Sequence, residues 1–593
     1  MRFIIPITLL LFVFTSCQET KEAEETLNGS EALANLLADY QEESYELFPW
    51  SATFAGDNRF NDKLPNFYSQ KFKQDQKDYY LKYKEAISAI DDSELDENEL
   101  LSKKILIWEC DRNLEGLEFP GELLPVDQFN SPLLMFAQLG SGQSAQPFKT
   151  KKDYTDWLAR LEAMIPIVDT AMVNMKKGIA QGYVLPKSLT MKVIPQMQSL
   201  ISESAEQSIF YGPINLLPED MDQADKDSLT VAYTNIINDK ISPKMAEMFQ
   251  FINTTYLDAG RETSGISALP GGREQYDKLI KLFTTTDMTA DEIHQLGLDE
   301  VARIRSEMER VKNQVGFEGT LREFFDHVRN KKELMPFTDP QQVIDNFNAI
   351  HDKMKPQIDK LFDMQPKTQF EVRRTEAFRE ASASAQYQPG TLDGTRPGIF
   401  YVPIPDVTSY NIYSDEDLFL HEAIPGHHFQ ASLTQENENL PRFRKTLWYS
   451  AYGEGWALYT ESLGKELGLY DDPYQYFGML SAEMHRAIRL VVDTGIHTKG
   501  WSREKAIQYS LDNEAESAAS ITSEMERYMA LPGQALSYKI GQLKILELRA
   551  KAESELGDNF DIKAFHNEIL DSGCLPLALL EEKINAWINS LKP

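Results

Sequence analysis

Apolar residues recur at intervals of three and four along most of the chain, which is the spacing of an amphipathic helix. Clear examples are the segments TADEIHQLGLDEVARIRSEMERV, TDPQQVIDNFNAIHDKM, SREKAIQYSL and SYKIGQLKILELRAKAESEL. Helix start signals support two of them. Thr289 with Glu292 fits a capping box, and Asp339 before Pro340 fits an N-cap followed by a first helical residue. The pattern therefore predicts a mainly α fold.

Alternation typical of strands is rare, and its best examples are EVRRTEAF and GIFYVPIP. Both precede the motif HEAIPGHHFQ at residues 421–430, so we expect a few short strands beside the helix that carries this motif. A break rich in Gly and Pro, ISALPGGREQY, begins near residue 266. We therefore expect an N-terminal helical lobe over residues 31–265 and a catalytic lobe over residues 266–593, with a deep central cleft between them.

The N-terminus, MRFIIPITLLLFVFTSC, contains an apolar run of about a dozen residues, which is too short to span a membrane. Its end at Cys17 resembles a bacterial lipoprotein signal. We expect a signal peptide over residues 1–17, a lipidated Cys17 and a flexible acidic tether over residues 18–30. The resemblance implies export to the bacterial cell envelope, on its periplasmic or surface side, with membrane contact only through Cys17. The alternative is an ordinary secretory signal.

Charge and cysteine content narrow the function further. The net charge is −32, with 92 acidic residues against 60 basic ones, which argues against nucleic acid as a partner. Beyond Cys17 the chain has only Cys110 and Cys574. An exported protein permits a disulfide, so these are either two buried thiols or one bridge.

The motif HEAIPGHHFQ resembles a stretched zinc-protease motif. A helix is expected to begin near Ser414, but Pro425 removes an amide donor and clashes with the carbonyl of His421, so the backbone should kink or bulge there. On a straight helix neither His427 nor His428 would lie beside His421. A bulge that absorbs two residues would bring His427 into place, and we favour it over His428 as the second ligand.

A zinc site needs a third protein ligand and an open position. The segment GEGWALYTE offers Glu454, 27 residues after His427, on a second helix that can return beside the first. Glu461 lies seven residues later and therefore on the same helix face. We expect Glu461 to orient a ligand or to cap a helix, with direct ligation of the metal as the weaker alternative.

Several motifs in order, among them GEGWALYTE, VVDTGIHTKGWSREKAIQY and ERYMALPGQALSYKIGQL, resemble bacterial domain-of-unknown-function family 885, whose signature reads HExxPGHH. That family resembles helical zinc carboxypeptidases of the M32 kind and, more distantly, the angiotensin-converting type. The resemblance implies a two-lobed helical zinc-metallopeptidase fold. It also aligns Gly426-His427 with the Gly-His of the M32 motif HExGH and supports Glu454 as a ligand. The insertion of two residues leaves His428 open as the alternative.

The implied chemistry is hydrolysis with Zn as cofactor and Glu422 as general base on a zinc-bound water. An oxyanion also needs a hydrogen-bond donor. Arg527-Tyr528 resembles an Arg-Tyr pair of the angiotensin-converting type, so Tyr528 is the first candidate, Tyr538 the reserve, and His497 either a further donor or a structural residue.

Three arginines are candidates for binding the substrate. Arg486 and Arg489 could hold a substrate carboxylate bidentately, and Arg527 stands next to the candidate donor Tyr528. The alternative for the first two is an ion pair with Glu483 or Asp493.

Three functions compete. The favoured one is an exported, lipid-anchored zinc peptidase acting on peptides, with carboxypeptidase or dipeptidase-like action suggested by the resemblance alone. The second is a zinc-dependent amidase or esterase acting on a small acyl-amide or another non-peptide substrate. The third is a non-catalytic binding lipoprotein that no longer holds metal.

Overall fold

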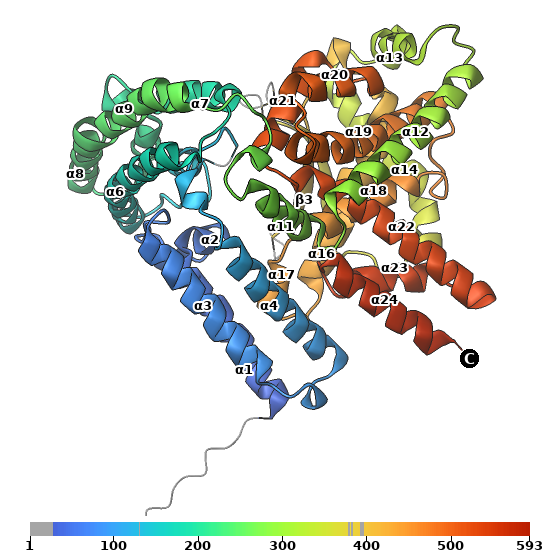
Figure 1. Cartoon of the computed structure of the whole chain (residues 1–593), viewed down its shortest axis with the longest axis horizontal. Helices are drawn as coiled ribbons and strands as arrows, with labels where there is room; N and C mark the ends of the chain where they lie inside the picture. Colours follow the sequence, from blue (N-terminus) through green and yellow to red (C-terminus); the bar gives the residue numbers. More distant parts are fainter. Residues whose placement is uncertain (1–27, 130, 377–379, 381–382, 392–395, 593) are drawn as a thin grey trace, which may run out of the picture.

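The computed structural model describes residues 28–129, 131–376, 380, 383–391 and 396–592. The fold is mainly α, as the hydrophobic periodicity predicts (Figure 1). The helices of the N-terminal part are α1 (Gly29–Leu47), α2 (Pro49–Phe54), α3 (Gln70–Ser88), α4 (Glu97–Gly116), α5 (Pro132–Leu139), α6 (Lys151–Gln181), α7 (Lys187–Ser199), α8 (Gln223–Ile236), α9 (Ser242–Phe251) and α10 (Leu257–Ala259).

The C-terminal part carries the motifs. Its helices are α11 (Gly272–Thr284), α12 (Ala290–Gln314), α13 (Leu321–Asn330), α14 (Pro340–Leu361), α15 (Asp415–Glu422), α16 (His427–Glu436), α17 (Arg442–Lys445), α18 (Ser450–Ser462), α19 (Pro473–Thr498), α20 (Arg503–Asn513), α21 (Ala518–Ala530), α22 (Ser537–Leu556), α23 (Ile562–Leu570) and α24 (Leu577–Leu591).

The predicted helix starts are confirmed. The Thr289 side chain accepts from the backbone N–H of Glu292, and the Glu292 side chain accepts in return from the N-cap backbone, which completes the capping box of α12. Asp339 caps α14, with Pro340 as its first residue.

A small three-stranded sheet lies before α15, in the order β1 (Phe370–Arg374), β3 (Gly398–Val402) and β2 (Gln386–Gln388). Strands β1 and β3 fall in the segments where alternation predicted strands, and they pair in parallel. The third strand was not predicted from the sequence. It pairs antiparallel to β3 and has two exposed glutamines around a half-buried Tyr387, which leaves little hydrophobic signal.

The buried apolar side chains form three clusters. One cluster lies within α5–α9 and their connections, at the upper left of Figure 1. A second joins residues of α1, α3 and α4 to residues of α14–α18 and α22–α24, and a third joins α12, α13, α19 and α21. Helices α1, α3 and α4 therefore share a core with the C-terminal part, so the clusters do not divide at the expected boundary near residue 265.

The expected signal peptide, Cys17 and nearly all of the expected tether lie outside the described residues, and α1 already begins at Gly29. Within the described residues, no helix combines the length and the apolar character that crossing a membrane requires. Cys110 and Cys574 are both buried free thiols, so of the two interpretations the bridge is not formed.

Candidate metal centre

The backbone breaks within HEAIPGHHFQ. Helix α15 ends at Glu422, and α16 begins at His427 after a connection that contains a cis peptide bond between Ile424 and Pro425. A Cβ atom added to Gly426 would lie 2.0 Å from the carbonyl oxygen of His421, so a side chain has no room there. The sequence predicted a kink or bulge at Pro425. The structure instead has two separate helices, with the second one starting directly after Pro425 and Gly426.

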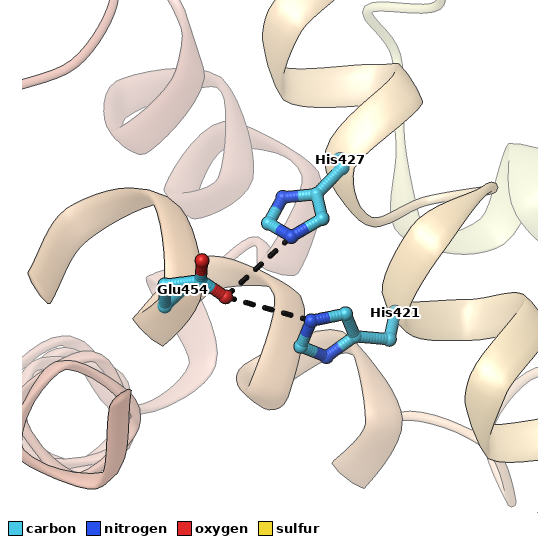
Figure 2. Close-up of side chains that lie close together, drawn as sticks. All are labelled: His421, His427 and Glu454. Atoms are coloured by element: carbon cyan, nitrogen blue, oxygen red, sulfur yellow. Dashed lines mark ion pairs between the residues drawn. The ribbon is translucent and has the colours of Figure 1, made fainter. Parts of the chain in front are cut away.

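This break brings three side chains together (Figure 2). The Nε2 atoms of His421 and His427 each lie 3.6 Å from the same carboxylate oxygen, Oε2 of Glu454. The candidate ligand atoms all lie within 4.8 Å of one another. Ligand atoms around a tetrahedral zinc, at bonds of about 2.1 Å, are about 3.4 Å apart. The spacing of the three side chains therefore fits a zinc ion.

The electrostatics of the cluster also fit a cation. Burial disfavours a charged imidazole at His421, but the nearby carboxylates of Glu454 and Glu461 outweigh it and raise the pKa of His421 to about 10. Glu454 is buried as well, yet its contacts with both imidazoles hold its pKa well below the usual range. Surroundings that favour a positive imidazole this strongly carry a negative potential, which a bound cation would neutralise.

Glu461 binds the other side of His421. Its Oε1 lies 2.7 Å from Nδ1 of His421, and both side chains are buried. The carboxylate can only accept, so Nδ1 carries a hydrogen, and Nε2 is the nitrogen that can bind a metal once it has lost its proton. Glu461 thus orients His421, one of the two roles that the heptad spacing suggested. His427 has no such support, because its buried Nδ1 has no hydrogen-bond partner among the described residues.

Glycines position Glu454 by letting α18 pack tightly on α22. A Cβ added to Gly455 would lie 2.5 Å from the backbone of Gly541, and one added to Gly541 would lie 1.8 Å from the carbonyl oxygen of Ala451. The hydroxyls of Ser450 and Ser537 join the first turns of the two helices at 2.7 Å. The backbone that carries Glu454 is therefore fixed on both sides of this residue.

Glu422 follows His421 directly at the end of α15. Burial raises the pKa of its carboxyl group, an effect opposed by His421 and His427 and reinforced by Glu454. A largely buried carboxylate next to a metal-ligand cluster, with a raised pKa, has properties of a general base.

His428 lies away from this cluster. Its Nδ1 is 2.9 Å from the hydroxyl of Tyr387 and 3.3 Å from that of Ser432, and its ring lies against Phe370. Burial lowers its pKa to about 4. Of the two candidate second histidines, the structure thus brings His427 to His421 and turns His428 toward the sheet.

Tyr528 is part of a buried polar network rather than a free donor. Its hydroxyl accepts from Nε of Arg489 at 2.9 Å and donates to Glu524 at 2.7 Å. A phenol has one proton to donate, and here Glu524 takes it. Tyr528, the first candidate oxyanion donor from the sequence, therefore has no hydroxyl proton free to donate in this conformation.

Tyr538, the reserve, is better suited. It lies in the first turn of α22, next to the first turn of α18, and the guanidinium of Arg489 sits 4.5 Å from the centre of its ring. Its hydroxyl forms no hydrogen bond within the described part of the chain. Of the two tyrosines, only Tyr538 therefore keeps a hydroxyl that no described residue engages.

Two of the three candidate arginines have unused donors. Nη1 of Arg489 and Nε of Arg486 are buried without hydrogen-bond partners among the described residues. Arg527 instead binds Glu524 at 2.8 Å. The alternative of ion pairs with Glu483 or Asp493 is wrong for the described contacts, because these acids bind other partners. Glu483 binds Lys539 and Arg303, and Asp493 accepts from Tyr276.

His497 is satisfied at both ring nitrogens. The backbone N–H of Ile266 donates to its Nδ1, and its Nε2–H donates to the carbonyl of Tyr528, both at 3.0 Å. Burial lowers its pKa to about 3. With no donor left over, His497 is a structural residue that ties α19 to α21, and the catalytic interpretation is not supported.

Sequence reasoning missed Glu524, on which this arginine–tyrosine network converges. It accepts from Arg489, Arg527 and Tyr528 and contacts His485. Its spacing of three and four residues before Arg527-Tyr528 on one helix could have indicated the contact.

Fold and site together define a mainly α protein with a candidate centre of two histidines and one glutamate. The family model described as "Bacterial protein of unknown function (DUF885)" matches residues 49–584, and the chain belongs to this family. Membership of this family is confirmed, while the resemblance to M32 carboxypeptidases and the angiotensin-converting type stays a prediction.

Two solved structures are similar to nearly the whole chain. The "putative lipoprotein" of Colwellia psychrerythraea has a TM-score of 0.85 and 29% identity, over 95% of this chain and 100% of that one. A "putative lipoprotein of unknown function" from Shewanella oneidensis has a TM-score of 0.75 and 19% identity, over 93% and 99% of the two chains, which shows a shared fold. No curated protein matches the chain.

Proposed function

We propose that this protein is a zinc-dependent peptidase. The observation that carries the proposal is the convergence of His421, His427 and Glu454 on one point, with the buried carboxyl of Glu422 next to the first histidine. Two imidazoles and a carboxylate, here from the three helices α15, α16 and α18, are a known ligand set of catalytic zinc sites, which keep a fourth position open.

Bound zinc would supply a Lewis acid that lowers the pKa of water and polarises the scissile carbonyl. Glu422 would take a proton from the attacking water at its carboxylate and deliver it to the leaving amine. Tyr538, whose hydroxyl has no hydrogen bond to any described residue, would donate to the developing oxyanion. Glu461 would keep the imidazole of His421 in the tautomer that leaves Nε2 unprotonated.

Carboxypeptidase or dipeptidase-like action is supported by the unused donors of Arg486 and Arg489. On each guanidinium one buried N–H donor has no acceptor among the described residues, which favours an anionic acceptor, and a peptide's terminal carboxylate is one.

For localisation, we propose a lipoprotein anchored through Cys17 in the bacterial cell envelope. The apolar N-terminal segment ending at this cysteine supports it. The similar protein of Colwellia psychrerythraea is described as a "putative lipoprotein", which supports the same interpretation.

The decisive variant is Glu422→Gln, compared with wild type for zinc content and for turnover. We expect the variant to retain zinc and to lose about 10²–10⁴-fold in turnover of peptides, because the amide cannot accept the proton. Released amino acids are measured for free and C-terminally amidated peptides, and released carboxylic acids for esters and acyl amides.

The outcomes separate the competing functions. Cleavage of esters or acyl amides but no peptide would support the amidase or esterase alternative. Full activity of Glu422→Gln would contradict the general-base role. A wild-type protein that neither contains zinc nor takes it up would contradict both enzyme functions and leave the non-catalytic binding lipoprotein as the remaining interpretation.

A further inference from the structure

A large aromatic side chain stands exposed beside the metal-ligand cluster. Trp448 lies in the connection between α17 and α18, and 53% of its surface is exposed. The centre of its ring is 5.9 Å from that of His427, at an interplanar angle of 54°. An indole left half open to solvent is unusual unless something covers it, since tryptophan is highly buried on average.

The indole is held against the helix that carries Glu454. A Cβ atom added to Gly453 would lie 2.2 Å from the six-membered ring of Trp448, so the ring occupies the space that a side chain at this position would fill. Gly453 directly precedes Glu454 in the first turn of α18. Trp448 therefore lies beside two of the three candidate ligands. Its ring is next to that of His427, and it packs against Gly453, the residue before Glu454.

We propose that Trp448 is a specificity-determining residue that binds an apolar, preferably aromatic, side chain of the substrate next to the scissile bond. This inference rests on the proposed peptidase function and adds the substrate class. A ring 5.9 Å from that of His427 lies within reach of a substrate side chain next to a bond held at the metal centre. Its exposed surface offers an apolar area and a π-face, and aromatic pairs stabilise contacts beyond the area that they bury.

The test compares wild type, Trp448→Ala and Trp448→Phe on two peptides that differ only at the residue beside the scissile bond, Phe in one and Gly in the other. We expect Trp448→Ala to lower kcat/KM for the Phe peptide about tenfold and for the Gly peptide less than about threefold. Trp448→Phe keeps a ring and should retain most of the preference. Val231→Ala, at an exposed apolar position on α8, serves as the control and should change neither value.

A second readout does not depend on turnover. Binding of the same peptides, carrying a fluorescent label, is followed by anisotropy with the Glu422→Gln protein and with the double variant that also carries Trp448→Ala. We expect the loss of Trp448 to weaken binding of the Phe peptide about tenfold while binding of the Gly peptide stays within about threefold.

Equal effects on both peptides, or none, with zinc content unchanged, would overturn the assignment of Trp448 while leaving the peptidase proposal intact. If wild type cleaves no peptide of the panel, the peptidase proposal fails first, and the specificity role fails with it.

Discussion

Glu454 and Glu461 lie one heptad apart on α18, yet they bind opposite sides of His421. Glu454 approaches Nε2 at 3.6 Å, and Glu461 binds Nδ1 at 2.7 Å. The sequence spacing predicted that both carboxylates share a helix face. It could not predict which of them faces the metal position, because that depends on where α15 crosses α18 in space.

Substitution of the two glutamates should separate these roles. We expect Glu454→Ala to abolish zinc binding, because a ligand is lost. Glu461→Gln should retain zinc with an affinity lowered about 10–100-fold, because only the orientation of His421 is weakened. Competition with a chromogenic chelator measures both affinities. A Glu461→Gln protein with wild-type affinity would refute the orienting role.

The buried state of His497, on α19, predicts how the stability of the protein depends on pH. His497 is neutral in the fold, with a pKa lowered by burial to about 3, whereas an unfolded histidine titrates near about 6.5. The unfolded chain therefore binds a proton that the native state excludes, so this stabilisation is complete above pH of about 6.5 and is lost as the pH falls toward the folded value.

His497→Gln should reduce the acid sensitivity of the protein. Each excluded proton steepens the pH dependence of the free energy of unfolding by up to about 1.4 kcal/mol per pH unit. We expect the variant to be less stable than wild type at pH 7 but to lose stability less steeply toward pH 4, as followed by urea denaturation. Parallel pH profiles for the two proteins would contradict the neutral, buried assignment.

At the scale of elements, the metal centre depends on one break and one close helix contact. The sequence predicted the helix that carries HE, its interruption at Pro425 and a second helix with Glu454. It did not predict that α16 would begin at His427 itself, because the direction of a chain after a proline depends on what it packs against. Here the carbonyl of Pro425 accepts from the indole N–H of Trp456, a contact between segments 31 residues apart.

The contact between α18 and α22 requires glycine. Gly541→Ala would place a methyl group against the carbonyl oxygen of Ala451, only one turn before Glu454. We expect a lower Tm and weaker zinc binding, because the helices must separate by the size of a methyl group. Gly116→Ala, at the end of α4, is the control, since an added Cβ has nothing within 4 Å. Differential scanning fluorimetry and zinc titration compare the two, and equal behaviour would argue against the close contact.

At the scale of the molecule, periodicity predicted a mainly α chain but not how its cores divide. Residues such as Leu33, Tyr83 and Ile105 share one apolar cluster with Trp456 and Ile584. The Gly/Pro-rich segment near residue 266 could not predict that these helices share a core. Apolar patterning shows which face of a helix is buried, but not which partner buries it. The deep cleft expected between the two lobes stays a prediction.

The central claim is that one metal ion binds between α15, α16 and α18 through His421, His427 and Glu454. Zinc content of the purified protein, measured by inductively coupled plasma mass spectrometry, tests it most directly when wild type is compared with His427→Ala and His428→Ala. The account predicts one zinc per chain in wild type, none in His427→Ala and retained zinc in His428→Ala. Zinc retained in His427→Ala but lost in His428→Ala would contradict it.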